Sequence, residues 1–491
     1  MILFAFAKIM GTFVISSFLA LVFIIFSSSA TMYLTGLVII GAEYLLYTLI
    51  GQNSFLNLLK YINIFYIDGG EFFGSYLNLN IFSNAVTSIP IAFAVFGTVF
   101  LLCTVFSCIL FCKRNQQKTA GIFSRLLEKF KSRFFTLNGS TGVFKGEVFK
   151  FTIQNKMAVM IVLFVLFAII SSFGTVRYPY SENSDADYKA YMEYLEGDIT
   201  SEKENYILKQ QNYFNNLQQR MGEIAENSEL SENAKQAMSK SIENILNSKG
   251  IAFERVIEQY NRLLELDKKG IDAKFIDENI YKSFVSSKTR EWNDFALLCL
   301  VLVIGVPYVF SPEYKNGMIN LIRTTENGKT KLFFGKIVVE CIYLLIAFTA
   351  LYVPYFVRFI NTYGANSLNT PLVCIFENVQ ETSFSVINAV VVNLICYFLL
   401  ATAVTFVITA VSIFTRSSMF TMVVSTVLVI LPLLALYSIE NVRIGYWVVN
   451  SHIIAIVMTC LLSILIAIVT LEISKLKFTE TRIWRRINAK A

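Results

Sequence analysis

The chain has 491 residues, of which 55% are apolar and 16% are charged, and its mean hydropathy is +0.57. These values lie outside the range of soluble globular proteins and indicate an integral membrane protein. The single histidine, His452, excludes histidine-rich metal sites and argues against Ser-His or Cys-His catalysis, so we predict no catalytic and no metal-binding residues. The net charge of +7 is concentrated beside apolar runs, which argues against a nucleic-acid partner.

Nine apolar runs are long enough to cross a bilayer of about 30 Å, which takes about 20 helical residues. They cover roughly residues 9–26, 30–50, 88–112, 157–175, 293–310, 334–356, 388–411, 418–438 and 452–474. The sequence therefore predicts an all-α polytopic membrane protein with about nine transmembrane helices. Its predicted location is the cell (cytoplasmic) membrane, with the lipid bilayer as its first partner.

Charge placement predicts which segments face the cytoplasm. Segment 113–156 contains ten Lys or Arg and two Glu, and the tail 475–491 contains six Lys or Arg and one Glu. Short basic segments beside membrane helices stay in the cytoplasm, so we expect a cytoplasmic linker at 113–156 and a cytoplasmic C-terminus. Segment 176–291 has 16 basic and 21 acidic residues and is expected on the opposite side.

Segment 176–291 has the periodicity of packed helices. Tyr188, Tyr191, Met192 and Leu195 recur at helical spacing, and a second apolar stripe comprises Phe253, Val256, Ile257, Tyr260, Leu263 and Leu264. Ser201 and Glu204 have the spacing of a capping box. We therefore predict an extracytoplasmic domain of three to five helices.

The segment after the fifth apolar run has the pattern of a short interfacial helix. Ser311 suits an N-cap, Pro312 the first helical position and Glu313 the first turn. The spacing then predicts an apolar face toward the membrane and a polar face toward the cytoplasm. The apolar face comprises Tyr314, Met318, Leu321 and Ile322, and the polar face Lys315, Asn316, Asn320 and Arg323.

This segment resembles the coupling segment of type-two ABC exporter permeases. The resemblance rests on Glu313 and Gly317, a leucine-rich turn, a polar loop, and Gly335-Lys336 opening the next span. Six spans with a large outer loop between the first two extend it over 157–474, and residues 1–112 match in part. It implies that 312–333 docks on a separate ABC ATPase subunit. The implied coupling residues are Glu313, Tyr314, Gly317, Met318, Leu321, Arg323, Gly335 and Lys336.

The resemblance divides the chain into four parts. Residues 1–112 form a partial permease half of three helices, 113–156 a linker with amphipathic surface helices, 157–474 a six-helix half, and 475–491 a tail. A complete transporter needs two coupling surfaces, so either a second permease copy pairs with this one or the natural protein extends upstream. The implied substrate is a peptide, a lipid or a drug.

No ATPase site is expected in the chain itself. Gly328-Lys329-Thr330 has the end of a phosphate-loop motif, but Arg323 stands where that motif requires its first glycine. The chain therefore needs no cofactor of its own, and a partner subunit hydrolyses the ATP. The alternative function is a membrane-embedded receptor or sensor with a helical extracytoplasmic domain, which leaves 311–336 without a purpose.

Two carboxylates interrupt the apolar runs. Glu43 lies inside the 30–50 run, where a charge is costly, so it either lines a transport path or is neutral and hydrogen-bonded to a neighbouring helix. Glu340 lies one helical turn beyond Lys336, and this spacing predicts an ion pair between them near the inner surface.

Overall fold

The computed structural model describes residues 2–25, 88–113, 142–176, 178–180, 182, 184–226, 231–314, 318–325, 328–376, 379, 384–437, 439 and 441–479. Between 26 and 87 it describes only 36, 39–40, 43, 46–47, 63–68, 78–81 and 84–87. These residues are almost entirely helical, with two small antiparallel two-stranded sheets.

Seven helical segments within the described ranges are long and apolar enough to span a membrane. They are Ala5–Ile25, Ile89–Cys112, Glu278–Tyr314, Thr330–Tyr363, Val386–Thr415, Ser418–Tyr437 and Ile453–Thr479. A further pair, Val143–Gln154 and Met157–Phe173, is bent by 69° and counts as an eighth span if taken as one. The all-α polytopic fold class is therefore confirmed. The count of nine stays a prediction, because most of the expected span 30–50 falls among residues whose structure is not described.

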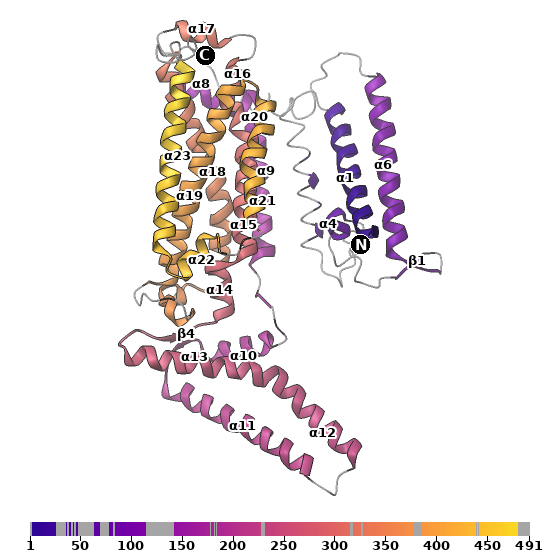
Figure 1. Ribbon diagram of the computed structural model, residues 1–491, viewed down its shortest axis with the longest axis vertical. Coiled ribbons are helices and arrows are strands. Elements are labelled where there is room, and N and C mark those ends of the chain that lie inside the picture. The colour runs from indigo at the N-terminus through magenta and orange to yellow at the C-terminus, as the bar shows by residue number, and fades with distance from the viewer. Residues whose placement is uncertain are drawn as a thin grey trace.

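The main bundle buries its fifth expected span most deeply. This span contains α14 (Glu278–Ser286), α15 (Lys288–Gly305) and α16 (Pro307–Tyr314), and 72% of its most apolar window is buried. Around it stand the remaining helices: α9 (Met157–Thr175), α18 (Thr330–Tyr363), α19 (Val386–Thr415), α20 (Ser418–Ser425), η6 (Thr426–Ile430), α21 (Leu431–Tyr437) and α23 (Ile453–Thr479). Helix α19 packs along α23, and α18 packs along α9 (Figure 1).

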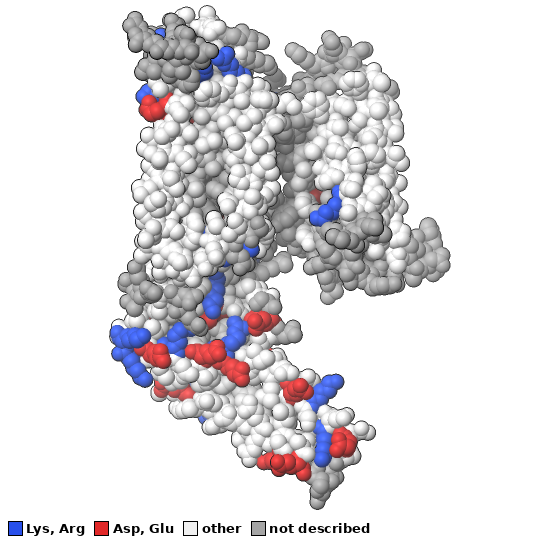
Figure 2. Space-filling view, viewed as in Figure 1, with Lys and Arg blue, Asp and Glu red and all other residues white. Residues whose placement is uncertain are grey.

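The outer surface of this bundle suits contact with lipid. Leu461, Leu465 and Ile468 on α23 are each more than half exposed. Figure 2 shows a broad uncharged band along the bundle, with Lys, Arg, Asp and Glu gathered toward its two ends. This is the surface that a bilayer around the bundle requires, because a charge facing hydrocarbon is costly.

The two ends of the bundle carry different structures. At one end lie α8 (Val143–Phe149), η1 (Lys150–Gln154), α16 and α17 (Met318–Thr324), and the helices of segment 176–291 lie at the other (Figure 1). The predicted inner and outer segments are thus at opposite ends. Short helices η4 (Asn366–Asn369), η5 (Leu372–Cys374) and α22 (Ile444–Val449) complete the bundle.

Segment 176–291 is helical, as its periodicity predicts. It contains α10 (Asp185–Leu195), α11 (Ser201–Glu226), α12 (Glu232–Ile245), η2 (Leu246–Gly250), α13 (Ile251–Lys268) and α14, with β3 (Gly197–Asp198) paired to β4 (Lys274–Phe275). The predicted stripes are buried together, with Leu195, Val256 and Leu263 all inaccessible. The residue that caps α11 is Thr200 rather than Ser201, because Thr200 Oγ1 accepts from the Lys203 amide at 3.4 Å.

The N-terminal helices form a small core of their own. Helix α1 (Ile2–Ile25) packs along α6 (Ser88–Lys113), beside α4 (Ile64–Asp68) and the hairpin of β1 (Asn78–Ile81) and β2 (Asn84–Thr87). Ala7, Val14 and Phe96 are buried between them. Residues 114–141 of the expected amphipathic linker 113–156 lie outside the described residues.

Candidate functional site

Four charged side chains from three separate segments meet at the end of the bundle that carries α17. Lys336 Nζ on α18 lies 2.5 Å from Glu147 Oε2 on α8 and 3.0 Å from Glu313 Oε1 on α16. Lys150 Nζ lies 2.8 Å from Glu147 Oε1 and 2.9 Å from the same Glu313 oxygen. We call these four residues the inner ion cluster.

The inner ion cluster is balanced in charge and mostly buried. The side chains of Lys336, Glu147 and Glu313 are 1%, 5% and 5% exposed, while Lys150 is 40% exposed and reaches the edge. Lys336 also donates to the Val309 carbonyl at 2.7 Å. Two lysines against two carboxylates leave no uncompensated charge, which is the condition under which buried ions are tolerated. The cluster therefore ties α8, α16 and α18 into one unit.

The predicted ion pair between Lys336 and Glu340 is wrong. Lys336 uses its donors on Glu147, Glu313 and the Val309 carbonyl, since these three acceptors together outcompete one carboxylate a turn away. Glu340 is fully buried and instead accepts from Thr409 Oγ1 at 2.7 Å, a contact between α18 and α19.

The expected start of the inner helix is also wrong. Helix α16 begins at Pro307, so Pro312 lies inside it and Ser311 is buried with its hydroxyl 2.9 Å from that of Ser412. A proline inside a helix leaves the carbonyl four residues earlier without its donor. That carbonyl belongs to Tyr308, and Asn155 Nδ2 donates to it at 3.0 Å. A side chain from the bend before α9 thus replaces the missing backbone bond.

Helix α17 buries a residue that was not assigned to its predicted apolar face. Met318 and Leu321 are 51% and 70% exposed, whereas Ile319 is buried and Ile322 packs against the core. The predicted periodicity assumes one helix running through from Pro312, but α16 ends at Tyr314 and α17 begins at Met318 with its own orientation. Met318 and Leu321 are therefore available for contact with lipid or with a partner, and their facing the membrane stays a prediction.

Arg323, expected on a free polar face, joins α17 to the last span. Its Nε donates to the Phe478 carbonyl at 2.8 Å and its Nη2 to the Lys477 carbonyl at 3.3 Å. These carbonyls lie in the last turn of α23, where helix carbonyls lack backbone partners and favour a cation. A displacement of α17 therefore acts on α23 directly.

The remaining predicted residues have varied settings. Tyr314 is half-buried at the end of α16, while Gly317 lies between the described ranges. Gly335 is the sixth residue of α18 rather than its opening, and a side chain there would contact Val143 of α8. Glu43 is half-buried, and its backbone carbonyl accepts from Asn63 Nδ2 at 2.6 Å. A transport role of the Glu43 carboxylate remains a prediction.

Sequence reasoning missed Glu147 and Lys150 as members of this site. They lie 189 and 163 residues before their partners Lys336 and Glu313. The available signal was local: Glu147 is one of only two acidic residues in the basic segment 113–156, and Lys150 follows it at i, i+3.

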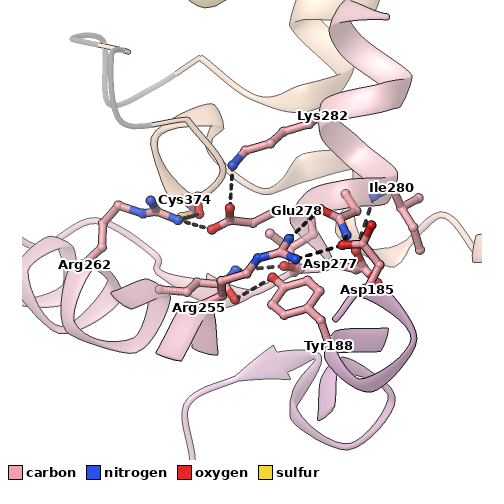
Figure 3. Close-up of polar contacts among 12 residues, drawn as sticks. Asp185, Tyr188, Arg255, Arg262, Asp277, Glu278, Ile280, Lys282 and Cys374 are labelled. Atoms are coloured by element: carbon pink, nitrogen blue, oxygen red, sulfur yellow. Dashed lines mark hydrogen bonds and ion pairs between the residues drawn. The ribbon is translucent and has the colours of Figure 1, made fainter. Parts of the chain in front are cut away.

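A second polar network joins α10 and α13 to the start of α14 at the opposite end (Figure 3). The Arg255 guanidinium stacks over the Tyr188 ring and donates to Asp185 Oδ1 at 2.8 Å and Asn279 Oδ1 at 2.6 Å. Arg262 binds Glu278 and the Cys374 carbonyl. We call this network the outer junction, and it fixes segment 176–291 to the bundle.

Asp277 lies at the outer junction and caps α14. Its Oδ1 accepts from the Ile280 amide at 3.3 Å and from the Tyr178 hydroxyl at 3.4 Å. Burial raises the pKa of Asp277 to about 6, against the lowering effect of these hydrogen bonds. Within the described part of the chain, no group of three or more His, Cys, Asp or Glu is placed to hold a metal ion.

No protein-family model matches the chain, and no curated protein or solved structure matches it either. The function is therefore inferred from the side chains and the geometry at the two ends of the bundle.

Proposed function

We propose that the chain is the transmembrane permease subunit of an ATP-driven ABC exporter, and that 312–333 couples it to a separate ATPase. The observation that carries this proposal is the attachment of α17. The helix exposes Met318 and Leu321 at the end of the bundle, while Arg323 holds it to the last turn of α23. An exposed apolar face on a firmly attached helix suits docking of a protein partner.

The inner ion cluster supplies the second link in this coupling. Glu313 at the end of α16 binds Lys336 on α18 and Lys150 beside α8, so a force on the segment reaches both. Helix α16 also packs against α19 and α20. An ATPase that moves α17 would therefore displace several spans together, as ATP-driven alternating access requires. The cargo in this proposal is a peptide, a lipid or a drug.

The orientation of the bundle in the membrane is part of the same proposal. The end with α17 faces the cytoplasm, where ATP is available, and segment 176–291 faces outward. A second permease copy supplies the second coupling surface.

The experiment is a cross-link placed on α17. A photoreactive residue at Asn320, which is exposed beside Leu321, is expected to capture a protein with a phosphate-loop ATPase motif in the native host. Leu321→Glu should abolish this capture while the protein remains inserted and monodisperse. Leu208→Glu is the matched control, because Leu208 is 55% exposed on α11 at the opposite end, and it should leave capture intact. Capture unaffected by Leu321→Glu, or no ATPase captured, would remove the proposal.

A receptor function is the second candidate, and the outer junction favours it. Arg255 and Arg262 connect α13 to α14, and α14 leads directly into the most buried span. A signal bound to segment 176–291 would thus reach the bundle. In this case a soluble ligand should protect α10 and α13 from hydrogen exchange, and Leu321→Glu should leave signalling unchanged.

A further inference from the structure

A cavity of about 50 Å³ lies between α14, α15, α18 and α19, in the half of the bundle nearer to segment 176–291. Its polar lining comprises Arg290, Glu291, Asp294, Tyr352, Tyr355, Asn393 and Tyr397, and apolar side chains form the rest. Three of these residues carry a charge and come from one helix, α15. Charged groups inside a span are costly and therefore call for partners.

Glu291 has its partners within the protein. Its Oε2 accepts from the Tyr397 hydroxyl at 2.9 Å and from the Gly445 amide at 3.1 Å, and Arg443 Nη1 lies 3.9 Å from its Oε1. The backbone of Gly445 approaches so closely that a Cβ there would lie 2.1 Å from the carboxylate. Glu291 thus pairs with Arg443, and the other two charged residues of the cavity lining are Arg290 and Asp294.

Arg290 and Asp294 do not form a direct ion pair with each other. They are separated by one helical turn, yet no ion pair within 4 Å joins them, and Asp294 has no hydrogen bond to any residue that the structure describes. Arg290 Nη2 donates to the Phe284 carbonyl at 2.6 Å, and the guanidinium lies over the Tyr355 ring at 4.3 Å from its centroid, but Nη1 has no hydrogen-bond partner among the described residues. One cationic donor and one carboxylate therefore border the same cavity, each with bonding capacity unused.

Neutral side chains around the cavity also have polar atoms without hydrogen-bond partners. Asn393 is 8% exposed, and its Nδ2 donates to the Val285 carbonyl, but its Oδ1 has no partner among the described residues. The Tyr352 hydroxyl also has none within that set. An occupant that satisfies this lining must offer donors near Asp294 and Asn393 and acceptors near Arg290 and Tyr352.

We propose that the cavity binds a small zwitterion of the α-amino-acid type, with its ammonium group at Asp294 and its carboxylate at Arg290. A group with a single charge would bind one of these side chains and leave the unused hydrogen-bonding atoms of the other unsatisfied. The volume of about 50 Å³ exceeds the roughly 10–15 Å³ that one water requires, so the cavity has room for a ligand of a few heavy atoms. Glycine has five heavy atoms and fills this space, whereas a larger substrate could place only its amino-acid end there.

The site stands independently of ATPase coupling, because it is a binding proposal about the isolated chain. The test is a thermal-stability titration of the purified full-length protein in detergent. A ligand that binds the folded state alone raises the melting temperature in a saturable way. Glycine is expected to do so, while methylammonium and acetate, each with one of its two charges, should produce no saturable shift at equal concentration.

Variants test whether the shift in melting temperature arises from binding at Asp294. Asp294→Asn should raise the glycine concentration for half the shift by more than about tenfold, which is the loss expected for one charge-assisted hydrogen bond. Asp267→Asn changes an exposed carboxylate on α13 and should leave the titration unchanged. An equal shift with methylammonium would identify a simple cation site, and no shift with any ligand would identify a cavity filled by water. Either result would overturn the proposal, and so would an unchanged titration of Asp294→Asn. If that variant fails to fold, the comparison of glycine, methylammonium and acetate on the wild-type protein still tests the proposal.

Discussion

Lys336 of α18 and Glu313 of α16 form a buried ion pair at 3.0 Å that, together with Glu147, joins the helices at the end of the bundle that carries α17. The pair lies where the polypeptide leaves one span, forms α17 and enters the next. Its members are 23 residues apart, but the third member, Glu147, comes from 189 residues before Lys336. Both the coupling proposal and the stability of this end depend on this contact.

The first prediction concerns the charge balance of the inner ion cluster. Lys336→Met leaves Glu147 and Glu313 with Lys150 alone, and breaking a buried ion pair from one side costs about 3–5 kcal/mol. We expect a marked drop in melting temperature in detergent. Lys331→Met, which changes an exposed lysine of the same helix, should have little effect.

A compensating variant separates charge from packing in this experiment. Adding Glu313→Gln to Lys336→Met restores a one-to-one balance between Lys150 and Glu147, so part of the lost stability should return. If the double variant is no more stable than Lys336→Met, the loss arises from packing and the electrostatic account is wrong.

The second prediction concerns the replacement of a backbone hydrogen bond by a side chain. Asn155→Ala should leave the Tyr308 carbonyl unsatisfied, at a cost of about 1–3 kcal/mol. Pro312→Ala supplies a backbone N–H for that carbonyl, so Asn155→Ala should cost less in a Pro312→Ala background. A double-mutant cycle on melting temperature measures this difference. Additive effects of the two changes would show that Asn155 and Pro312 do not act on the same carbonyl.

The third prediction compares two glycines inside helices. A Cβ on Gly305 would lie 2.3 Å from the Tyr343 hydroxyl, which donates to the Val301 carbonyl at 2.8 Å, so Gly305→Ala must displace a buried ring. Overpacking of this kind costs about 1–3 kcal/mol. A Cβ on Gly97 meets nothing within 4 Å, and Gly97→Ala should be neutral or stabilising because alanine favours a helix by about 1 kcal/mol. Melting curves of the two variants should shift in opposite directions or differ clearly; equal shifts would contradict the packing at Gly305.

The spans were predictable from the sequence because the bilayer imposes a simple rule. A helix in hydrocarbon needs a long apolar run, and each such run in the described part of the chain is helical. Their ends were less predictable, since α18 begins at Thr330 and continues to Tyr363, several residues beyond the apolar run on each side. The ends of a helix that extend beyond the hydrocarbon need not be apolar, so hydropathy does not mark where the helix begins or ends.

The site was predictable only where local pattern determines it. The sequence indicated Glu313 and Lys336 as members of one segment but not their direct contact, because that contact also requires α8. The burial of Ile319 on α17 was not predicted, because the orientation of this helix also depends on Arg323 binding the end of α23. Arg290 and Asp294 could not be connected with Asn393, because helix packing alone brings α15 and α19 together.

The fourth prediction is a pH dependence at the outer junction. The folded protein holds the proton of Asp277 more tightly than the unfolded chain, with a pKa of about 6 against an ordinary 3.8. The stabilisation from this proton is complete below the ordinary pKa and is lost as the pH rises through 6. The junction should therefore open less readily at pH 5 than at pH 7, by about tenfold, which corresponds to one pKa unit.

Hydrogen exchange of α10 and α14, corrected for the intrinsic pH dependence of exchange, measures this opening. Asp277→Asn retains a side-chain acceptor for the Ile280 amide but cannot ionise, so its exchange should vary less with pH. The same pH dependence in Asp277→Asn as in wild type would assign the effect to another group.

The fifth prediction fixes the orientation of the bundle. Segment 176–291 and α17 lie at opposite ends, so the membrane must separate them if the surrounding helices span it (Figure 1). A protease site inserted after Glu226, at the end of α11, should be cut in intact cells if that segment faces outward. A second site placed after Thr479, at the end of α23, should be cut only after the membrane is opened. The reverse cleavage pattern would place α17 outside the cell, where no ATP-driven partner could reach Met318 and Leu321. Cleavage of both sites in intact cells would contradict the membrane-spanning arrangement itself.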